Sequence, residues 1–187
     1  MEPGEAQEIL DAIKDHKEWK AGLARTPELT GTIKQNLELK AADGEVVKDL
    51  LQKLYQRLGS VKAIAKYAFL SKISVPKFNK YVEGGTYNRH TDASQMQPQV
   101  RTDYACTLFL SDPDTYEGGE FNIEVPNGYD VGVQTVKGAQ GEAMVYQCGQ
   151  PHWVTPVTEG ERISMVCWMQ SALRDPWTRQ LVQSMSS

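Results

Sequence analysis

The sequence contains little cysteine. Its 187 residues include only Cys106, Cys148 and Cys167, and no two of these are spaced as a CxxC pair. An odd count without paired spacing argues against a disulfide framework or a zinc ribbon. Each cysteine lies beside apolar or strand-forming residues, which predicts buried free thiols in a reducing compartment.

Long apolar runs and an excess of positive charge are also missing. No stretch approaches the ~20 apolar residues of a transmembrane helix, and the acidic residues 1–5 lack the apolar run of a signal peptide. The net charge is −4 at pH 7, so there is no basic patch for nucleic acid or an anionic membrane. We therefore expect a cytoplasmic protein with neither partner; the sequence gives no indication of oligomeric state.

The chain divides into a helical start and a β-rich remainder. We expect one domain over residues 1–187, with helical support in 1–70 and a β core in 71–175. Apolar residues recur at helical spacing in 5–19 and 44–58. Gly59 and Ser60 are expected to end the second helix, with Ser60 capping a third over 61–69.

Short strands separated by turn-forming residues fill the second half. The expected strands cover 72–82, 86–92, 102–110, 119–125, 131–136, 142–147, 152–157 and 162–170. Such a series is typical of a double-sheet jelly roll or a small barrel, a mainly β fold with the N-terminal helices packed along one sheet. The tail after Arg174 is expected to form a short helix.

Three residues of the β-rich half indicate a metal site. In a strand, residues two apart point to the same face, so His90 and Asp92 can converge on one ion. His152 is the other histidine of this half and can supply a third ligand. Two imidazoles and one carboxylate on a rigid scaffold match a mononuclear non-haem Fe(II) centre with open positions, whereas structural zinc favours a closed tetrahedral shell.

Arg162 opens an apolar strand ten residues after His152. Alternation places Arg162, Ser164, Val166 and Trp168 on one face. A guanidinium on a core-facing position is costly unless an anion meets it, and its geometry suits a carboxylate. The alternative is an exposed arginine that pairs with Glu159 or Glu161.

With these residues in place, the chain resembles the Fe(II)- and 2-oxoglutarate-dependent dioxygenases, and more narrowly the prolyl 4-hydroxylase-like group that includes bacterial PKHD-type hydroxylases. The resemblance covers about residues 75–175. The stretches that carry it are Phe78-Asn79-Lys80-Tyr81, Tyr87-Asn88-Arg89-His90-Thr91-Asp92, Arg101-Thr102-Asp103, Thr107-Leu108-Phe109-Leu110-Ser111-Asp112-Pro113, Tyr116-Glu117-Gly118-Gly119-Glu120-Phe121 and His152-Trp153-Val154-Thr155-Pro156-Val157.

The resemblance implies a double-stranded β-helix and a role for each matched residue. His90, Asp92 and His152 are expected to bind Fe(II). Arg162 is expected to bind the distal carboxylate of 2-oxoglutarate, with Tyr81 lining that cosubstrate pocket. The implied cofactor and cosubstrates are Fe(II), 2-oxoglutarate and O₂, with ascorbate as a candidate reductant.

Three further features of the sequence bear on the predicted site. Phe109 lies where some relatives have a tyrosine that helps to hold the distal carboxylate, and phenylalanine cannot donate that hydrogen bond; Thr107 is a candidate substitute. Gly118-Gly119 indicates either close backbone approach near the iron or a turn that requires positive φ. The polar segment 93–100 shows no strand pattern and is interpreted as a substrate flap, or else as an inert surface loop.

The expected activity is hydroxylation of an unactivated C–H bond, with release of succinate and CO₂. The target favoured by the resemblance is a prolyl residue in a peptide or protein. The alternatives are the same chemistry on a small molecule or a non-prolyl target, and a metal-binding β-helix module without turnover.

Overall fold

The computed structural model describes residues 1–23, 31–97, 99–127 and 129–185. The helices are α1 (Pro3–Ile13), α3 (Glu45–Ser60), α4 (Lys62–Ala68) and α5 (Pro176–Met185), with 3-10 turns η1 (Ala41–Asp43) and η2 (Pro113–Thr115). The strands are β1 (Lys20–Ala21), β2 (Lys34–Gln35), β3 (Leu37–Leu39), β4 (Leu70–Ile73), β5 (Lys77–Tyr81), β6 (Thr86–His90), β7 (Gln95–Met96), β8 (Val100–Arg101), β9 (Tyr104–Phe109), β10 (Tyr116–Gly118), β11 (Phe121–Asn127), β12 (Asp130–Val136), β13 (Ala143–Gln147), β14 (His152–Val154), β15 (Val157–Gly160) and β16 (Arg162–Ser171).

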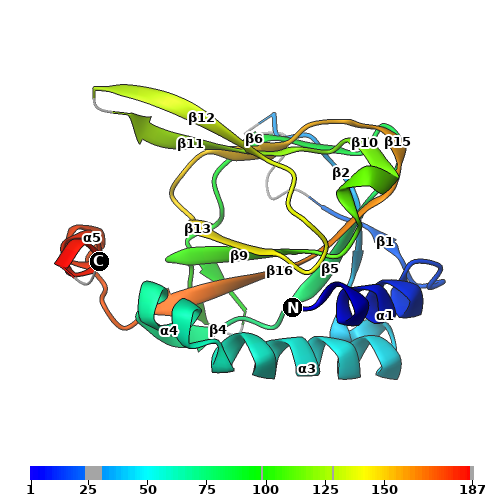
Figure 1. Cartoon of the computed structure of the whole chain (residues 1–187), viewed down its shortest axis with the longest axis horizontal. Helices are drawn as coiled ribbons and strands as arrows, with labels where there is room; N and C mark the ends of the chain where they lie inside the picture. The colour runs from blue at the N-terminus through cyan, green and yellow to red at the C-terminus, as the bar shows by residue number, and fades with distance from the viewer. Residues whose placement is uncertain (24–30, 98, 128, 186–187) are drawn as a thin grey trace.

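Two antiparallel sheets face each other across the molecule (Figure 1). The larger sheet has the order β1-β3-β5-β16-β9-β13, with β4 also paired to β16, and the smaller has the order β12-β11-β14-β6-β2. The hairpin of β11 and β12 extends beyond the body of the molecule (Figure 1). This arrangement confirms the expected mainly β jelly roll.

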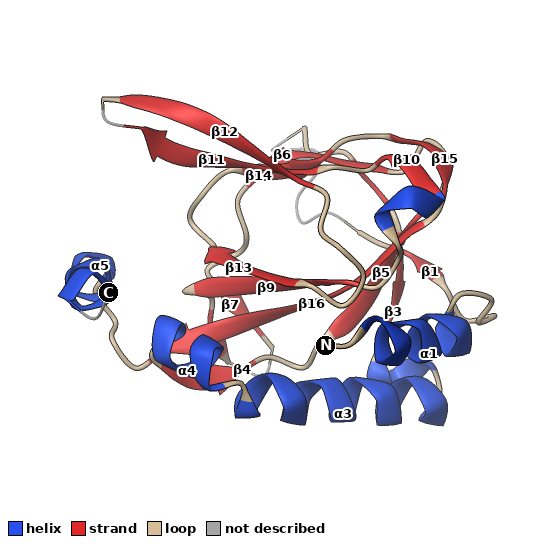
Figure 2. Cartoon of the chain, in the orientation of Figure 1, coloured by secondary structure: helices blue, strands red, loops and turns tan. Residues whose placement is uncertain are grey.

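The helices cover the outer side of the larger sheet, as Figure 2 shows for α1, α3 and α4. Helix α3 buries Val47, Leu51, Leu54 and Leu58 along one stripe, the spacing expected of an amphipathic helix. These residues share one apolar cluster with Met165 of β16 and its neighbours on the outer face of the sheet. The helices therefore stabilise the sheet from outside and leave its inner face for other uses.

Strand β16 divides its side chains between two environments. Ile163, Met165, Cys167 and Met169 belong to the cluster under the helices. Arg162, Ser164, Val166 and Trp168 line a cavity between the two sheets. The alternation predicted from the sequence is therefore confirmed.

Two helix boundaries differ from the predictions. The first helix ends at Ile13 rather than at residue 19, because residues 14–18 are all polar and offer nothing to bury. Trp19 folds back, and its indole Nε1 donates to the Ile13 carbonyl at 2.8 Å. Lys80 Nζ donates to the Lys14 carbonyl at 2.9 Å, which satisfies another group at that helix end.

Gly59 and Ser60 do not end the second helix. Both lie in the last turn of α3, and the chain leaves the helix at Val61, whose ψ is 103°. The Ser60 hydroxyl donates to the Arg57 carbonyl at 2.7 Å instead of capping α4. This local bond back to the preceding turn is a common alternative for serine within a helix.

Prolines divide two of the predicted strands. The stretch 72–82 is split into β4 and β5 around Pro76, and 152–157 is split into β14 and β15 around Pro156. Proline has no N–H to give to a strand ladder, so pairing stops beside it. Residues 158–160, between the predicted strands 152–157 and 162–170, belong to β15, which pairs with β10.

Three smaller expectations also have an outcome. Cys106, Cys148 and Cys167 are free and buried, as predicted. Among the described residues, the helices are all too short or too polar to cross a membrane. The segment 93–100 is not without strands, because β7 and β8 form a short antiparallel pair within and beside it.

Candidate active site

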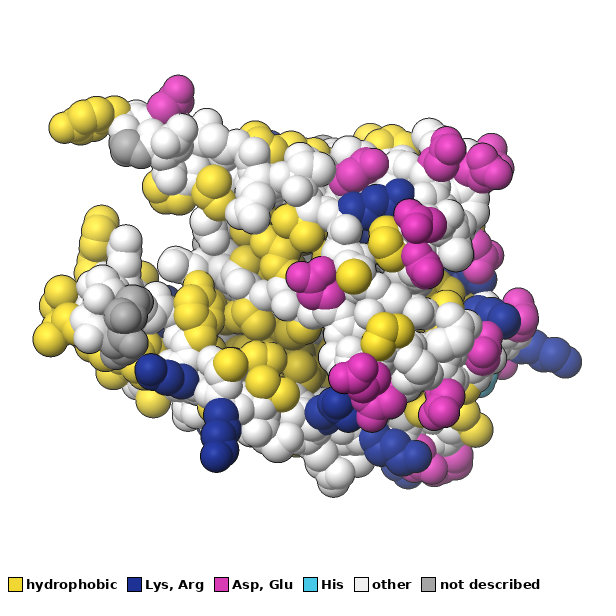
Figure 3. Space-filling view, viewed as in Figure 1, with side chains coloured by type: hydrophobic (Ala, Val, Ile, Leu, Met, Phe, Trp, Pro, Cys, Tyr) yellow, Lys and Arg dark blue, Asp and Glu magenta, His cyan; other side chains and the backbone are white. Residues whose placement is uncertain are grey.

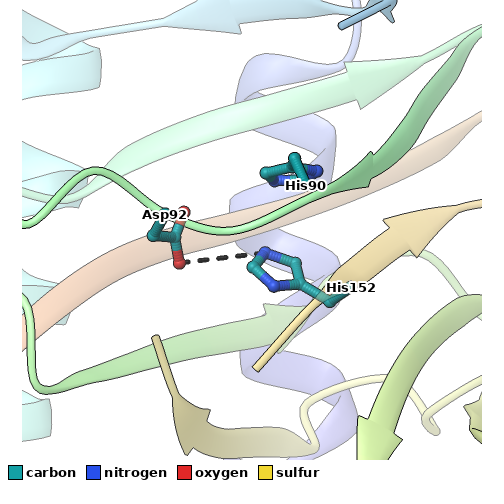
Figure 4. A group of neighbouring side chains, drawn as sticks. All are labelled: His90, Asp92 and His152. Carbon is teal, nitrogen blue, oxygen red and sulfur yellow. Dashed lines mark ion pairs between the residues drawn. The ribbon is translucent and has the colours of Figure 1, made fainter. Parts of the chain in front are cut away.

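His90, Asp92 and His152 lie together on the inner side of the smaller sheet. His90 is the last residue of β6 and is the direct register partner of His152, the first residue of β14. Asp92 lies two residues beyond the end of β6, and its Oδ2 is 3.8 Å from His152 Nε2 (Figure 4). One ligand atom of each residue lies within 4.8 Å of those of the other two.

The hydrogen bonds of the two imidazoles determine which ring nitrogens are available. His90 Nδ1 is 2.8 Å from the Asn88 carbonyl, and His152 Nδ1 is 2.9 Å from the Gln150 carbonyl. A carbonyl oxygen only accepts, so each Nδ1 carries the proton and donates. Each Nε2 is thereby left with a lone pair, the arrangement usual for metal-bound histidine.

The surroundings favour neutral imidazole and disfavour an isolated carboxylate. Burial, and then the charge of His152, lower the pKa of His90 to about 3. Tyr87 stacks on the His90 ring with the centroids 3.5 Å apart. Burial raises the pKa of Asp92, and Asp92 Oδ2 is buried without a hydrogen-bond partner. A cation between the three residues would balance the buried negative charge on that oxygen.

The donor set fits an open metal centre. Within the described part of the chain, the group contains two histidines and one carboxylate and no fourth ligating side chain. Three ligands on one side leave positions for exogenous molecules, as in non-haem Fe(II) sites. A closed structural zinc site would need a fourth protein ligand.

A cavity of about 910 Å³ extends from this group between the sheets. Arg162 lies in its wall and is only 2% exposed. Its Nη1 donates to Ser164 Oγ at 3.2 Å, and its Nε is buried without a partner. In the described ranges no carboxylate comes within ion-pair distance of Arg162, and Glu161 pairs with Lys80 at 2.7 Å. The alternative of an exposed, ion-paired arginine is therefore wrong.

Two aromatic rings flank the Arg162 guanidinium. Arg162 Cζ lies 5.3 Å from the ring centroid of its register partner Tyr81 and 5.5 Å from that of Phe109. Tyr81 lines the cavity, and burial raises its pKa to about 12, so its hydroxyl stays protonated.

Gly118 and Gly119 have the positive φ expected of a turn, but they do not approach the candidate iron site. Their φ values are +68° and +65°, and a Cβ on Gly118 would lie 2.1 Å from the Pro156 carbonyl oxygen. A Cβ on Gly119 would lie 3.1 Å from Arg162 Cδ. The close approaches are therefore to Pro156 at Gly118 and to the buried Arg162 at Gly119, and not to the His–Asp–His group.

Several residues of the cavity were not predicted as site residues. Tyr146 and Phe121 pack on His152, with ring centroids at 5.0 Å and 5.6 Å. Lys34, Glu38 and Lys77 also line the cavity, on strands β2, β3 and β5. No short motif links these three residues, so only the folded arrangement reveals them. Met96 and Gln97 of the segment 93–100 line the cavity as well.

Two prolyl hydroxylases are among the solved structures that share this fold. A prolyl-4-hydroxylase from Pseudomonas putida matches with a TM-score of 0.58 at 23% identity, over 90% of this chain and 85% of that one. A prolyl hydroxylase from Trichoplax adhaerens, solved with a peptide fragment of hypoxia inducible factor, matches with a TM-score of 0.59 at 14% identity, over 99% and 81%. These matches show that the chain shares the fold of the two hydroxylases.

The sequence comparisons identify the family. The model of the 2OG-Fe(II) oxygenase superfamily matches residues 76–170. A PKHD-type hydroxylase from Acidovorax ebreus is 37% identical over 92% of this chain and 76% of its own length, and one from Teredinibacter turnerae is 38% identical over 88% and 73%. The chain belongs to the 2OG-Fe(II) oxygenase superfamily. It is an enzyme of the 2-oxoglutarate-dependent dioxygenase class, and the family implies Fe(II), 2-oxoglutarate and O₂.

Proposed function

We propose that this enzyme hydroxylates an unactivated C–H bond of a prolyl residue in a peptide or protein, with conversion of 2-oxoglutarate to succinate and CO₂. The observation that carries the proposal is one cavity that contains both an open His–Asp–His group and a buried guanidinium without an anion. The prolyl target is supported by relatives and structural neighbours that are PKHD-type and prolyl hydroxylases.

His90, Asp92 and His152 are proposed to hold Fe(II). Their two free Nε2 atoms and the unpartnered Asp92 Oδ2 fit a divalent cation. When bound, the iron would supply the centre at which O₂ is activated by oxidative decarboxylation of the cosubstrate. The chain itself fixes the imidazole tautomers through the Asn88 and Gln150 carbonyls.

Arg162 is proposed to bind the distal carboxylate of 2-oxoglutarate. A buried guanidinium with an unused Nε has donors left for a carboxylate, and such pairs form charge-assisted hydrogen bonds. Tyr81 and Thr107 line the same cavity, whereas Phe109 contacts the guanidinium with its ring. Thr107 is therefore the proposed second contact of that carboxylate.

Three further assignments belong to the same proposal. Ascorbate is the proposed reductant that keeps the iron in its ferrous state between turnovers. The cytoplasm is the proposed compartment, supported by three free cysteines. The segment containing β7 is the proposed substrate flap, supported by Met96 and Gln97 in the cavity wall.

The test begins without oxygen. Purified enzyme with Fe(II) and 2-oxoglutarate is expected to give a weak visible charge-transfer band. Admission of isotopically labelled O₂ in the presence of proline-containing peptides should place one labelled atom in succinate and one in the peptide, detected by mass spectrometry. Binding of metal and 2-oxoglutarate without succinate from any peptide would overturn the proposed function.

A further inference from the structure

Three lysines surround one carboxylate in the wall of the cavity. Glu38 Oε1 lies 2.6 Å from Lys34 Nζ and 2.6 Å from Lys77 Nζ, and Glu38 Oε2 lies 3.1 Å from Lys40 Nζ. All four residues line the cavity that contains the His–Asp–His group. We call them the lysine cluster.

The charges of this cluster do not balance. Three ammonium groups face one carboxylate, a formal excess of two positive charges. The side chains of Lys34 and Lys77 are only 8% and 19% exposed. Among the described residues, neither comes within ion-pair distance of a second carboxylate. Partly buried like charges are costly, so a network built only to brace the strands would be expected to be neutral.

The excess charge persists at neutral pH. Burial, and then the neighbouring charge of Lys34, lower the pKa of Lys77 to about 8. Glu38 remains ionised, because Lys77 and Lys34 outweigh the effect of burial and hold its pKa at about 2. The cluster is positive although the protein as a whole has a net charge of −4. On the face shown in Figure 3, acidic side chains gather near α1 and the β10–β15 pair.

The cluster lies next to the proposed reaction centre. Lys34 Nζ is 5.2 Å from the ring centroid of Tyr87, and Tyr87 stacks directly on His90. Lys77 Nζ is 5.5 Å from the ring centroid of Trp168, on the cavity face of β16. A group bound at the lysines would therefore be about one aromatic side chain away from the metal ligands.

The proposed cofactor and cosubstrate leave this charge unused. The charges of Fe(II) and Arg162 together balance those of Asp92 and dianionic 2-oxoglutarate. The loaded inner cavity is then neutral, and Arg162 lies on β16 while Lys34 lies on β2 of the facing sheet. The excess at the lysine cluster is available for a different anion.

We infer that Lys34, Lys40 and Lys77 form a subsite for a carboxylate of the substrate, so that the enzyme selects acidic peptides. This inference rests on the proposed hydroxylase function and specifies its substrate class. The carboxylate would belong to an aspartyl or glutamyl side chain close in sequence to the hydroxylated residue. The volume of about 910 Å³ gives room for more than the cosubstrate alone.

The first experiment compares matched peptides. Each proline-containing peptide carries Asp or Glu near the proline, and its partner carries Asn or Gln. Succinate formation and peptide oxygenation are measured as kcat and KM. The acidic peptide is expected to have a KM about tenfold lower. Added salt should reduce the part of this preference that comes from Lys40, because its exposed charge is screened.

Single variants then test which lysine causes the preference for acidic peptides. Lys40→Gln is suited to the test because the Lys40 side chain is 60% exposed, so the fold should tolerate the change. It is expected to reduce the preference about threefold, and Lys40→Glu should reduce it further. Lys48→Gln is the matched control, since Lys48 lies on α3 and pairs with Glu45 at 3.1 Å. The control should keep the full preference.

Glu38→Gln distinguishes a substrate-binding role of the lysine cluster from a purely structural role. Removal of the only carboxylate raises the positive charge of the cluster, so the preference for acidic peptides should increase even if the free energy of unfolding falls. A brace without a substrate role would lose stability with no change in preference. If this variant does not fold, Lys40→Glu decides the question.

The outcomes distinguish the inference from the function on which it rests. Equal KM values for acidic and amide peptides that are both oxygenated would overturn the subsite and leave the hydroxylase intact. Oxygenation of free carboxylate-bearing small molecules but of no peptide would also overturn it. Fluorescence anisotropy of the labelled peptides gives the preference without turnover. It should therefore still show acidic selectivity if the proposed hydroxylation itself fails.

Discussion

His90 and His152 are direct partners across the β6–β14 ladder, with their ring centroids 4.3 Å apart. Opposed residues in an antiparallel pair share a face, so strand pairing alone brings two imidazoles together from positions far apart in the sequence. Asp92 reaches the same point from the loop that follows β6. The candidate metal centre is thus a property of sheet register as much as of ligand identity.

Removal of one imidazole is expected to abolish metal binding. Even outer partners of metal ligands contribute about 10–100-fold to affinity, so His90→Ala should lower Fe(II) affinity by at least that factor and eliminate succinate formation. Bound metal is measured after anaerobic desalting. His16→Ala removes a histidine at the end of the α1 region and should change neither quantity. Persistent 2-oxoglutarate turnover in His90→Ala would show that the ligand assignment is wrong.

Arg162→Met should separate cosubstrate binding from metal binding. Loss of the guanidinium is expected to raise the KM for 2-oxoglutarate about 100-fold, with Fe(II) affinity nearly unchanged. Because Arg162 is buried without an ion pair in the described structure, the metal-free variant should also be more stable, by about 1–2 kcal/mol in urea unfolding.

The control for that variant is Arg57→Met, at an exposed ion pair with Glu5. It should leave the 2-oxoglutarate requirement unchanged. A normal KM in Arg162→Met would remove Arg162 from its proposed role, whatever its effect on stability.

Gly119→Ala is expected to disturb the arginine through packing. Its φ of +65° makes alanine unfavourable, and the new Cβ would press on Arg162 Cδ. Gly84→Ala has a comparable φ of +79° with no atom within 4 Å of the new Cβ. Both variants should lose about 1 kcal/mol of stability, but only Gly119→Ala should raise the KM for 2-oxoglutarate. Identical kinetics for the two would argue against contact-mediated positioning of Arg162.

Lys77 should make the free energy of unfolding depend on pH in mild alkali. Its pKa is about 8 in the folded protein against an ordinary value of 10.5, so the unfolded chain binds more protons between these values. Lys77 is therefore expected to add about 1–2 kcal/mol to the free energy of unfolding between pH 8 and 10, as the folded lysine loses its unfavourable charge. Urea unfolding under reducing conditions measures this slope.

Lys77→Met should lack that contribution, whereas Lys48→Met, at an exposed position on α3, should retain it. The informative quantity is the difference between variant and parent at each pH, because cysteines and tyrosines of the unfolded chain also titrate in this window. Parallel curves for parent and Lys77→Met would contradict the assigned shift.

The sequence predicted the jelly roll because short strands and turn residues alternate along residues 71–175. Boundaries were less predictable where a distant contact decides them. Trp19 continues a helical stripe in the sequence, but its indole bonds the Ile13 carbonyl outside α1. Ser60 has two local choices, and it bonds the Arg57 carbonyl. Neither outcome can be read from propensity alone.

The candidate site also contains residues that the sequence predicts and residues that it does not. His90, Asp92 and Arg162 carry local signals, in the two-residue spacing of the first pair and in the strand alternation around the third. Lys34 and Lys77 have none, because β2 and β5 belong to different sheets and their lysines meet only at Glu38. A cluster assembled from separate strands depends on three-dimensional register, which one sequence does not specify.

The two faces of β16 limit how this protein can change. Arg162, Ser164, Val166 and Trp168 face the cavity, while Ile163, Met165, Cys167 and Met169 pack under the helices. Deletion or insertion of one residue in this strand would exchange the two sets and place the guanidinium in the apolar layer. Substitutions can therefore alter the cavity one position at a time. Insertions or deletions within β16, by contrast, should abolish both folding and activity.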